Sequence, residues 1–210
     1  MIDLHIHTTY SDGTDTVKEL LEKAENKKLD IISITDHDSI DAYFFLAKQP
    51  QIRTRFTGKI ITVCEFKTFF RGTSIEILGY NFDYQKIQMP NIDNLKVQML
   101  YLDFFKSVLD KYHFVYDVKE LYIDFNDPHK HYAGLVLAKE LLRHPENKGL
   151  IEEIGVFDEN TFFRIHQCNK NSIFYIDESL YYPEAKEIIR IIHEAGGLAF
   201  LAHPYLYNVE

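Results

Sequence analysis

Histidine and glutamate residues stand at the ends of several short apolar runs that are typical of β-strands. His5 and His7 lie in IDLHIH, His37 follows IISITD, Glu65 ends IITVCE, and His203 ends LAFLAH. In parallel β/α folds the carboxyl ends of the strands lie on one face, where active sites are assembled from residues far apart in sequence. We therefore expect these side chains to converge on a metal site.

The spacing of the first ligands suggests how ions would be held. His5 and His7 are two residues apart, so in a strand both imidazoles leave the same face, roughly 6 to 7 Å apart at Cβ, and can hold one ion. Asp12, in the turn SDG, and His37 offer oxygen and nitrogen to a second ion, a donor set that suits Zn, Mn and Fe. Glu65 can bridge two ions. An HxH pair alone is a weak signal, but the other strand-end ligands favour the metal interpretation.

The first eighty residues alternate strand and helix patterns, which predicts βαβ units with a parallel sheet or barrel. IDLHIH and DIISIT are expected strands, and TVKELLEKAENK is an expected helix capped by Asp15 or Thr16. SIDAYFFLAKQ predicts a helix that starts at Ser39. KIITVCEF and SIEILGYNF predict a hairpin around the turn signal RGTS.

The sequence pattern changes in the middle of the chain, where helical periodicity replaces the patterns typical of strands. Helices are expected in NLKVQMLYLDFFKSVLDKYHF, HYAGLVLAKELLRH and ENTFFRIHQ. The tail returns to the earlier pattern, with PEAKEIIRIIHEA as a helix, Gly196 and Gly197 as its stop, and LAFLAH as a strand. We predict an N-terminal β/α part at 1–82, a helical insertion at 83–170, and a return to the β/α part at 171–210.

Bulk composition excludes several classes of protein. The 210 residues are 46% hydrophobic and 26% charged, as in ordinary globular proteins, and no apolar run reaches the roughly 20 residues of a membrane helix. MIDLHIH lacks the features of a signal peptide, so we expect a cytoplasmic protein. Cys64 and Cys168 are too few for a disulfide framework.

The net charge of −9 argues against an extended nucleic-acid surface, because such binding depends on neutralising phosphates with Lys and Arg. It does not exclude a small phosphorylated substrate. Bound divalent ions would reverse the local sign where a phosphate has to sit.

Four segments in order, DLHIHTTYSDG, ITDHDSI, CEF and GGLAFLAHP, resemble the PHP family, named for polymerase and histidinol phosphatase. The likeness spans Met1 to Tyr205 and is greatest to small phosphoesterases, which include nucleoside 3′,5′-bisphosphate phosphatases. It implies a distorted (β/α) barrel of PHP type with a trinuclear metal centre at the strand ends. Two to three divalent ions are expected, Mn, Zn or Fe, with Mg as a further possibility.

The resemblance also implies how the ligands are shared. The first ion would be bound by His5, His7 and Glu65, the second by Asp12 and His37, and the third by Glu65 and His203. Glu65 would then be the bridge.

Two departures from the family pattern alter this expectation. Glu76 in IEILGY stands where the family usually has histidine, which makes a harder third ion, Mn or Mg, or an unfilled third position more plausible. A Gly-Ser-Asp-x-His type segment has no counterpart before Glu210, so we expect a barrel that is incomplete at its C-terminus, in a chain that is a fragment.

Further polar residues near these motifs have expected roles of their own. His129 occupies a position where the phosphoesterases have a substrate-facing arginine, so Lys130 or His131 would contribute a simpler charge to the substrate. A solvated helix start explains that segment equally well. Asp36 and Asp38 flank His37, and we expect solvated turn carboxylates there rather than hydrogen-bond partners of an imidazole.

The pattern as a whole predicts a metal-dependent phosphoesterase. Water bound to the ions would be the nucleophile, since metal binding lowers its pKa from 15.7 toward about 7, and the ions would neutralise the phosphate oxygens. A small nucleotide or related phosphomonoester is the expected substrate. The alternatives are a non-catalytic metal- or ligand-binding PHP module, as attached to some DNA polymerases, and a fragment inactivated by truncation.

Overall fold

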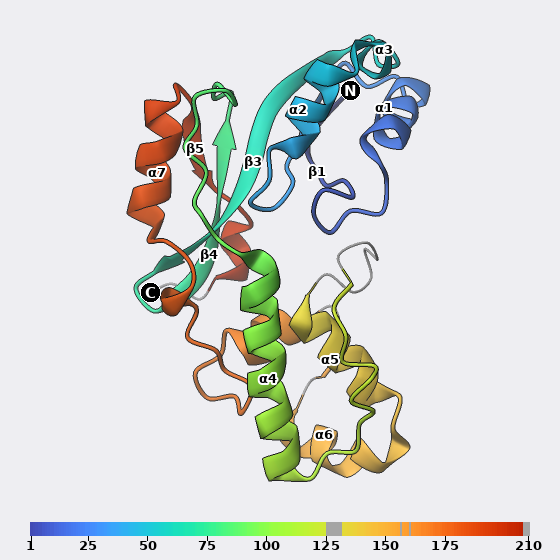
Figure 1. Cartoon of the computed structure of the whole chain (residues 1–210), viewed down its shortest axis with the longest axis vertical. Helices are drawn as coiled ribbons and strands as arrows, with labels where there is room; N and C mark the ends of the chain where they lie inside the picture. Colours follow the sequence, from blue (N-terminus) through green and yellow to red (C-terminus); the bar gives the residue numbers. More distant parts are fainter. Residues whose placement is uncertain (125–131, 156, 160, 208–210) are drawn as a thin grey trace. The chain divides into compact units, whose positions relative to one another are not determined.

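The computed structural model describes residues 1–124, 132–155, 157–159 and 161–207, which form two compact units (Figure 1). The sheet unit consists of residues 1–91 and 182–210, and the helical unit consists of residues 92–181.

A five-stranded sheet with the order β1-β2-β3-β4-β5 organises the sheet unit. The strands are β1 (Ile2–Ile6), β2 (Ile31–Ile34), β3 (Lys59–Phe70), β4 (Thr73–Tyr80) and β5 (Leu198–Leu201). The first three strands are parallel, as expected, whereas β4 is antiparallel to both β3 and β5. The described residues therefore form a mixed sheet with β1 and β5 at its edges. The predicted barrel, expected to be incomplete at its C-terminus, is not shown.

The β3–β4 hairpin is the longest paired element of the sheet, and its prediction from the sequence is confirmed. Arg71 and Gly72 join the strands with φ values of 48° and 85°, the positive values that a tight two-residue hairpin turn requires. β3 was expected to end near Glu65 but continues to Phe70, because the hairpin supplies β4 as a hydrogen-bonding partner along that length.

Among the described residues, four α-helices accompany the sheet: α1 (Val17–Asn26), α2 (Asp41–Lys48), α3 (Pro50–Arg53) and α7 (Ala185–Glu194). Thr16 caps α1 as one of the two residues expected to do so, in a reciprocal capping box with Glu19. α2 begins at Asp41, two residues later than expected. Ser39 precedes the helix, and its hydroxyl accepts a hydrogen bond from the Asp41 amide. The short helix α3 was not predicted.

The core of the sheet unit lies between one face of the sheet and the inner faces of α1, α2 and α7. Strand alternation decides which residues enter it. In β3, Cys64 and Phe66 are buried in the core, so Glu65 between them projects from the opposite face. In β4, Ile75 and Ile77 enter the core and leave Glu76 on that same opposite face.

The helical unit contains α4 (Asn94–Tyr112), α5 (Ala133–Leu142) and α6 (Lys148–Ile154). α4 and α5 were predicted, whereas α6 was not, and the helix expected in ENTFFRIHQ is reduced to a five-residue π-type turn, Phe163–Gln167. Phe105, Phe162 and Phe174 are fully buried and lie in edge-to-face or tilted contact. Short 3₁₀ turns occur at Pro145–Asn147 and Glu178–Leu180, and a third, Pro204–Leu206, lies in the sheet unit.

The two units divide at other places than the predicted boundaries at 82/83 and 170/171. Residues 83–91 belong to the sheet unit, where Ile87 is part of the core and the Asp83 amide donates to the Ala195 carbonyl. Residues 171–181 belong to the helical unit, because Phe174 packs in its aromatic core. Packing of single apolar side chains, which periodicity does not reveal, accounts for both differences.

Among the helices of the described residues, none combines the length and apolar character needed to cross a membrane.

Tyr43→Phe should lower the free energy of unfolding by ~1–3 kcal/mol. The Tyr43 hydroxyl donates to the Ile34 carbonyl at 2.6 Å and accepts from the Val63 amide at 2.8 Å, so its removal leaves buried backbone groups unpaired. Urea denaturation measures the change, with Tyr205→Phe, at a fully exposed tyrosine, as the matched control. If Tyr43→Phe and the wild type have equal free energies of unfolding, the Tyr43 hydroxyl does not stabilise β2 and β3 through these hydrogen bonds.

Candidate metal centre

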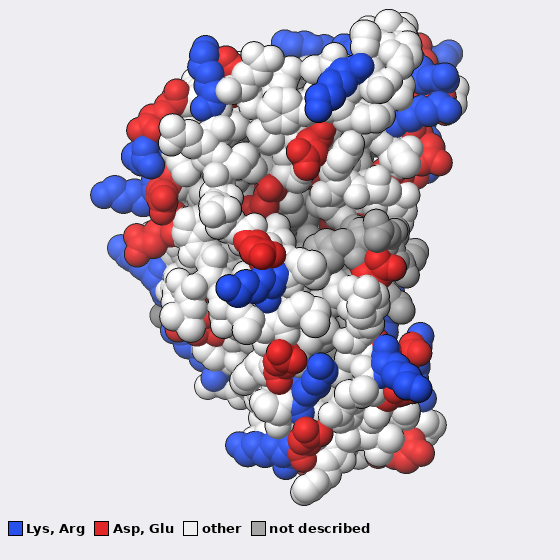
Figure 2. Space-filling model, viewed as in Figure 1, with Lys and Arg blue, Asp and Glu red and all other residues white. Residues whose placement is uncertain are grey.

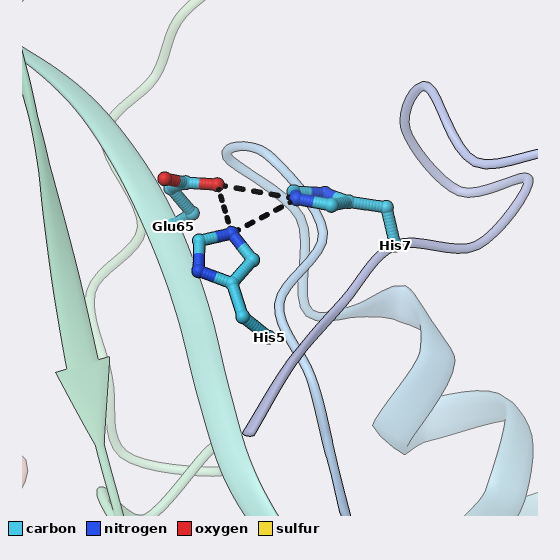
Figure 3. A group of neighbouring side chains, drawn as sticks. All are labelled: His5, His7 and Glu65. Atoms are coloured by element: carbon cyan, nitrogen blue, oxygen red, sulfur yellow. Dashed lines mark hydrogen bonds and ion pairs between the residues drawn. The ribbon is translucent and has the colours of Figure 1, made fainter. Parts of the chain in front are cut away.

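His5 and His7 project from the end of β1 toward Glu65 on β3 (Figure 3). Ile6 between them packs against the core, so the two imidazoles share the other face of the strand, as their spacing predicts. Nε2 of His5 lies 3.1 Å from Nε2 of His7 and 2.9 Å from Oε2 of Glu65. Nε2 of His7 lies 3.3 Å from the same oxygen, so three donor atoms converge on one point.

Glu65 occupies the middle of β3 rather than its end, and its side chain is fully buried. The segment that follows β2 fixes its backbone, because the Glu65 amide donates to the Asp36 carbonyl and the Asp38 amide donates to the Glu65 carbonyl. This pairing places His37 beside Glu65, with Nδ1 of His37 3.6 Å from Oε2. The sequence was right about which residues meet and wrong about Glu65 being at a strand end.

A second group of donors consists of His7, Asp12 and His37. Oδ1 of Asp12 lies 3.3 Å from Nδ1 of His7, and its Oδ2 lies 3.8 Å from Nε2 of His37. The SDG turn brings Asp12 to this group because Gly13 folds back on the residues just after β1, where its amide donates to the Thr8 carbonyl. A Cβ at Gly13 would lie 2.4 Å from the His7 carbonyl carbon, so only glycine permits this approach.

A third group consists of Glu65, Glu76 and His203. Nε2 of His203, just beyond β5, lies 3.0 Å from Oε1 of Glu65. Oε1 of Glu76 lies 3.5 Å from Nδ1 of His37, which brings the third group next to the second. The phenol of Tyr207 accepts a hydrogen bond from the Glu76 amide at 3.1 Å and lies 3.4 Å from its Oε2.

Electrostatic interactions in the cluster favour cations. Burial raises the pKa of Glu65, but hydrogen bonds from His5 and His7 and the positive charge of His37 outweigh burial and hold this pKa well below its usual range. Burial lowers the pKa of His7, yet its hydrogen bond to Glu65 and the charge of Asp12 raise it above the ordinary value. The centre therefore holds an ionised carboxylate and draws positive charge toward it.

The donor set fits divalent metal ions. The ligand atoms within each of the three groups lie within 4.8 Å of one another. Among the described residues, none donates a hydrogen bond to the buried Oε1 of Glu65, although Nε2 of His203 lies 3.0 Å from it. Imidazole nitrogen and carboxylate oxygen together are the donors that Zn, Mn and Fe take in proteins. The structure thus brings together all seven side chains predicted as ligands: His5, His7, Asp12, His37, Glu65, Glu76 and His203.

Other predictions about the site have different outcomes. Asp36 is not a solvated turn carboxylate, because it is only 1% exposed and accepts hydrogen bonds from Thr8 and Ser11. The contact between Tyr207 and Glu76 was not foreseen, since no spacing rule links a tyrosine near the end of the chain to β4. Lys130 and His131, expected at the substrate, lie outside the described residues.

Comparison with known proteins decides the family. Residues 3–198 match the PHP domain. The chain belongs to the PHP domain family. The resemblance inferred from the four motifs is thereby confirmed.

Two curated relatives of this PHP domain are hydrolases. A 5′-3′ exoribonuclease of Haemophilus influenzae is 28% identical over 209 residues, which are 99% of this chain and 70% of the relative. A phosphoribosyl 1,2-cyclic phosphate 1,2-diphosphodiesterase of Eggerthella lenta is 23% identical over 205 residues, which are 96% of this chain and 73% of the relative. Family and relatives together identify a hydrolytic enzyme.

A solved structure supports the fold alone. A Bifidobacterium adolescentis protein with the provisional assignment of metal-dependent phosphoesterase superposes with a TM-score of 0.58 at 20% sequence identity. The match covers 96% of this chain and 66% of that protein, so the chain spans about two thirds of its solved neighbour.

Glu65→Gln should release divalent ions from the PHP domain. Glu65 belongs to two of the three donor groups, and even changes outside the ligands typically weaken metal affinity ~10–100-fold, so losing a shared ligand should exceed that range. Isothermal titration with Mn²⁺ and Zn²⁺ measures the effect. Glu22→Gln, at a surface carboxylate paired with Arg55, is the matched control. Wild-type affinity in Glu65→Gln would contradict the assignment of Glu65 as a shared ligand.

Proposed function

We propose that this PHP domain hydrolyses a phosphate ester with two to three divalent metal ions. The supporting observation is the overlap of the three donor groups, which share His7 and Glu65 and so can hold ions side by side. The ligands in this proposal are His5, His7, Asp12, His37, Glu65, Glu76 and His203.

Bound ions would supply an activated water and neutralise the oxygens of the phosphate, as in two-metal phosphatases. The protein's own contribution is to fix the donors before substrate arrives. His5 lies in β1, His7 directly follows that strand, and Glu65 is buried in the middle of β3, so these ligands need little rearrangement. A buried carboxylate that stays ionised would serve as a ligand shared by two ions. The partly exposed Asp12 and His203 form the open side of the cluster, where substrate would enter.

A small nucleotide or related phosphomonoester is the substrate that the charge distribution favours. The chain carries a net charge of −9. On the face shown in Figure 2, the Lys and Arg side chains of the described residues are interspersed with Asp and Glu rather than gathered in one broad basic area. A single phosphate group can bind through metal ions, whereas a long nucleic acid needs many cationic contacts.

The terminal phosphodiester of an RNA is the second candidate substrate. It is favoured by the name of the Haemophilus influenzae relative and by a 5′-3′ exoribonuclease of Escherichia coli that is 35% identical over 99% of this chain and 67% of that relative. A non-catalytic PHP module is disfavoured, since these relatives are named as enzymes.

Removal of metal should abolish hydrolysis, and Mn²⁺ should restore it. The purified protein is treated with EDTA, dialysed, and assayed with and without added ions on a nucleoside 3′,5′-bisphosphate and on a short 5′-phosphorylated oligoribonucleotide. Release of inorganic phosphate from the first supports the phosphomonoesterase proposal, and stepwise release of nucleotides from the second supports the alternative. A metal-replete protein that hydrolyses neither compound contradicts both.

Glu76→His should shift the metal preference of the third group toward zinc. Two carboxylates and one imidazole suit Mn or Mg, whereas one carboxylate and two imidazoles suit Zn better. Competition between Zn²⁺ and Mn²⁺, read by elemental analysis, should show the Zn/Mn ratio rising by about tenfold or more, the scale of effects seen even outside the ligands. Glu76→Gln removes the charge without adding an imidazole. An unchanged ratio in Glu76→His would exclude Glu76 from the centre.

A further inference from the structure

Asp36 has a buried carboxylate that belongs to none of the three donor groups. It lies just after β2 and is 1% exposed, and both of its oxygens accept short hydrogen bonds. Oδ1 accepts from the Thr8 amide at 2.6 Å and from the Ser11 hydroxyl at 2.7 Å, and Oδ2 accepts from the Thr8 hydroxyl at 2.7 Å. A buried carboxylate needs such donors, and this one finds all three in the loop that follows β1.

These hydrogen bonds connect the two segments that carry one particular donor group. The loop held by Asp36 leads from His7 to Asp12, and His37 is the residue next to Asp36. The distance between Asp12 and His37 therefore depends on the hydrogen bonds by which Asp36 holds the loop. The Glu65, Glu76 and His203 group has its side chains on β3, on β4 and after β5, so the hydrogen bonds of Asp36 with the loop do not set its geometry.

Ser11 extends the connection to the donor atoms themselves. While its hydroxyl donates to Asp36, the same oxygen lies 3.5 Å from Nδ1 of His7 and 3.4 Å from Oδ1 of Asp12. Ser11 and Thr8 are both buried, so water does not compete for these contacts. Without the Asp36 carboxylate, the Ser11 side chain would lose its hydrogen-bond acceptor. The part of the loop next to His7 would then no longer be held in place.

We propose that Asp36 is a positioning residue that assembles the ion site formed by His7, Asp12 and His37 and leaves the group of Glu65, Glu76 and His203 unaffected. The inference rests on the proposed metal centre. It assigns a role to a residue that belongs to none of the three donor groups, and it explains why a carboxylate next to His37 is buried rather than solvated.

The test counts bound ions in variants of the full chain. Mn²⁺ titration followed by the EPR signal of the free ion should show that Asp36→Asn lowers affinity for about one ion per chain by ~10–100-fold, and Asp12→Ala should have the same effect. Combined with His203→Ala, Asp36→Asn should remove a further ion. Combined with Asp12→Ala, it should remove none, because both changes act on the same site.

Thr8 provides a gentler test if Asp36→Asn folds poorly. Thr8→Val deletes the hydroxyl that donates to Oδ2 and should weaken the same ion, whereas Thr8→Ser keeps the donor and should bind as wild type does. Tyr43→Phe controls for general destabilisation, because it removes a buried hydroxyl from the same unit without touching the loop.

The outcomes separate the inference from the proposed function. A wild-type chain that binds no Mn²⁺ overturns both. A wild type that binds ions while Asp36→Asn and Thr8→Val bind them equally well overturns only the role of Asp36. The role of Asp36 is also overturned if Asp36→Asn weakens Mn²⁺ binding at every site equally and Tyr43→Phe, at the same loss of stability, weakens it to the same extent.

Discussion

The buried carboxylate of Glu65 is the group on which the arrangement of the centre depends. Cys64 and Phe66 enter the hydrophobic core, so strand alternation sends Glu65 to the opposite face, where water does not reach it. An ionised carboxylate without water requires charged or hydrogen-bonding partners. It finds them in imidazoles that come from β1 and from the segment after β5. A cluster that attracts cations is the consequence.

The three donor groups differ in how firmly the chain holds them. The two groups that contain Glu65 include a residue of β3, whose backbone is paired on both sides. One side pairs with β2 and the segment after it, and the other side pairs with β4. The group that contains Asp12 relies on a loop, and loops keep a defined geometry only when local contacts hold them. The close approach of Gly13 to His7 and Thr8 and the hydrogen bonds to Asp36 supply these contacts. Elements as different as a strand and a turn can then present ligands to one centre.

The helical unit has an organisation of its own. Its aromatic core surrounds Phe174, and a buried Glu178 accepts hydrogen bonds from Tyr101 and Gln167, both at 3.0 Å. A packed core and buried polar groups with partners inside the same unit are features of an independent domain. The insertion therefore interrupts the chain between β4 and α7 without supplying the core that orients Glu65 and Glu76.

The sequence by itself determined the chemistry of the centre, because residue type and strand periodicity are local properties. The two-residue spacing of His5 and His7 predicted that both face the same side at the end of β1, and the placing of His37, Glu65 and His203 at the ends of expected strands predicted that they would meet them. Only the tertiary structure decided that Glu65 lies within a strand, since β3 is extended by pairing with β4. It also decided that Asp36 is buried and that Tyr207 reaches Glu76. These contacts join residues far apart in the chain, and no local pattern records such distances.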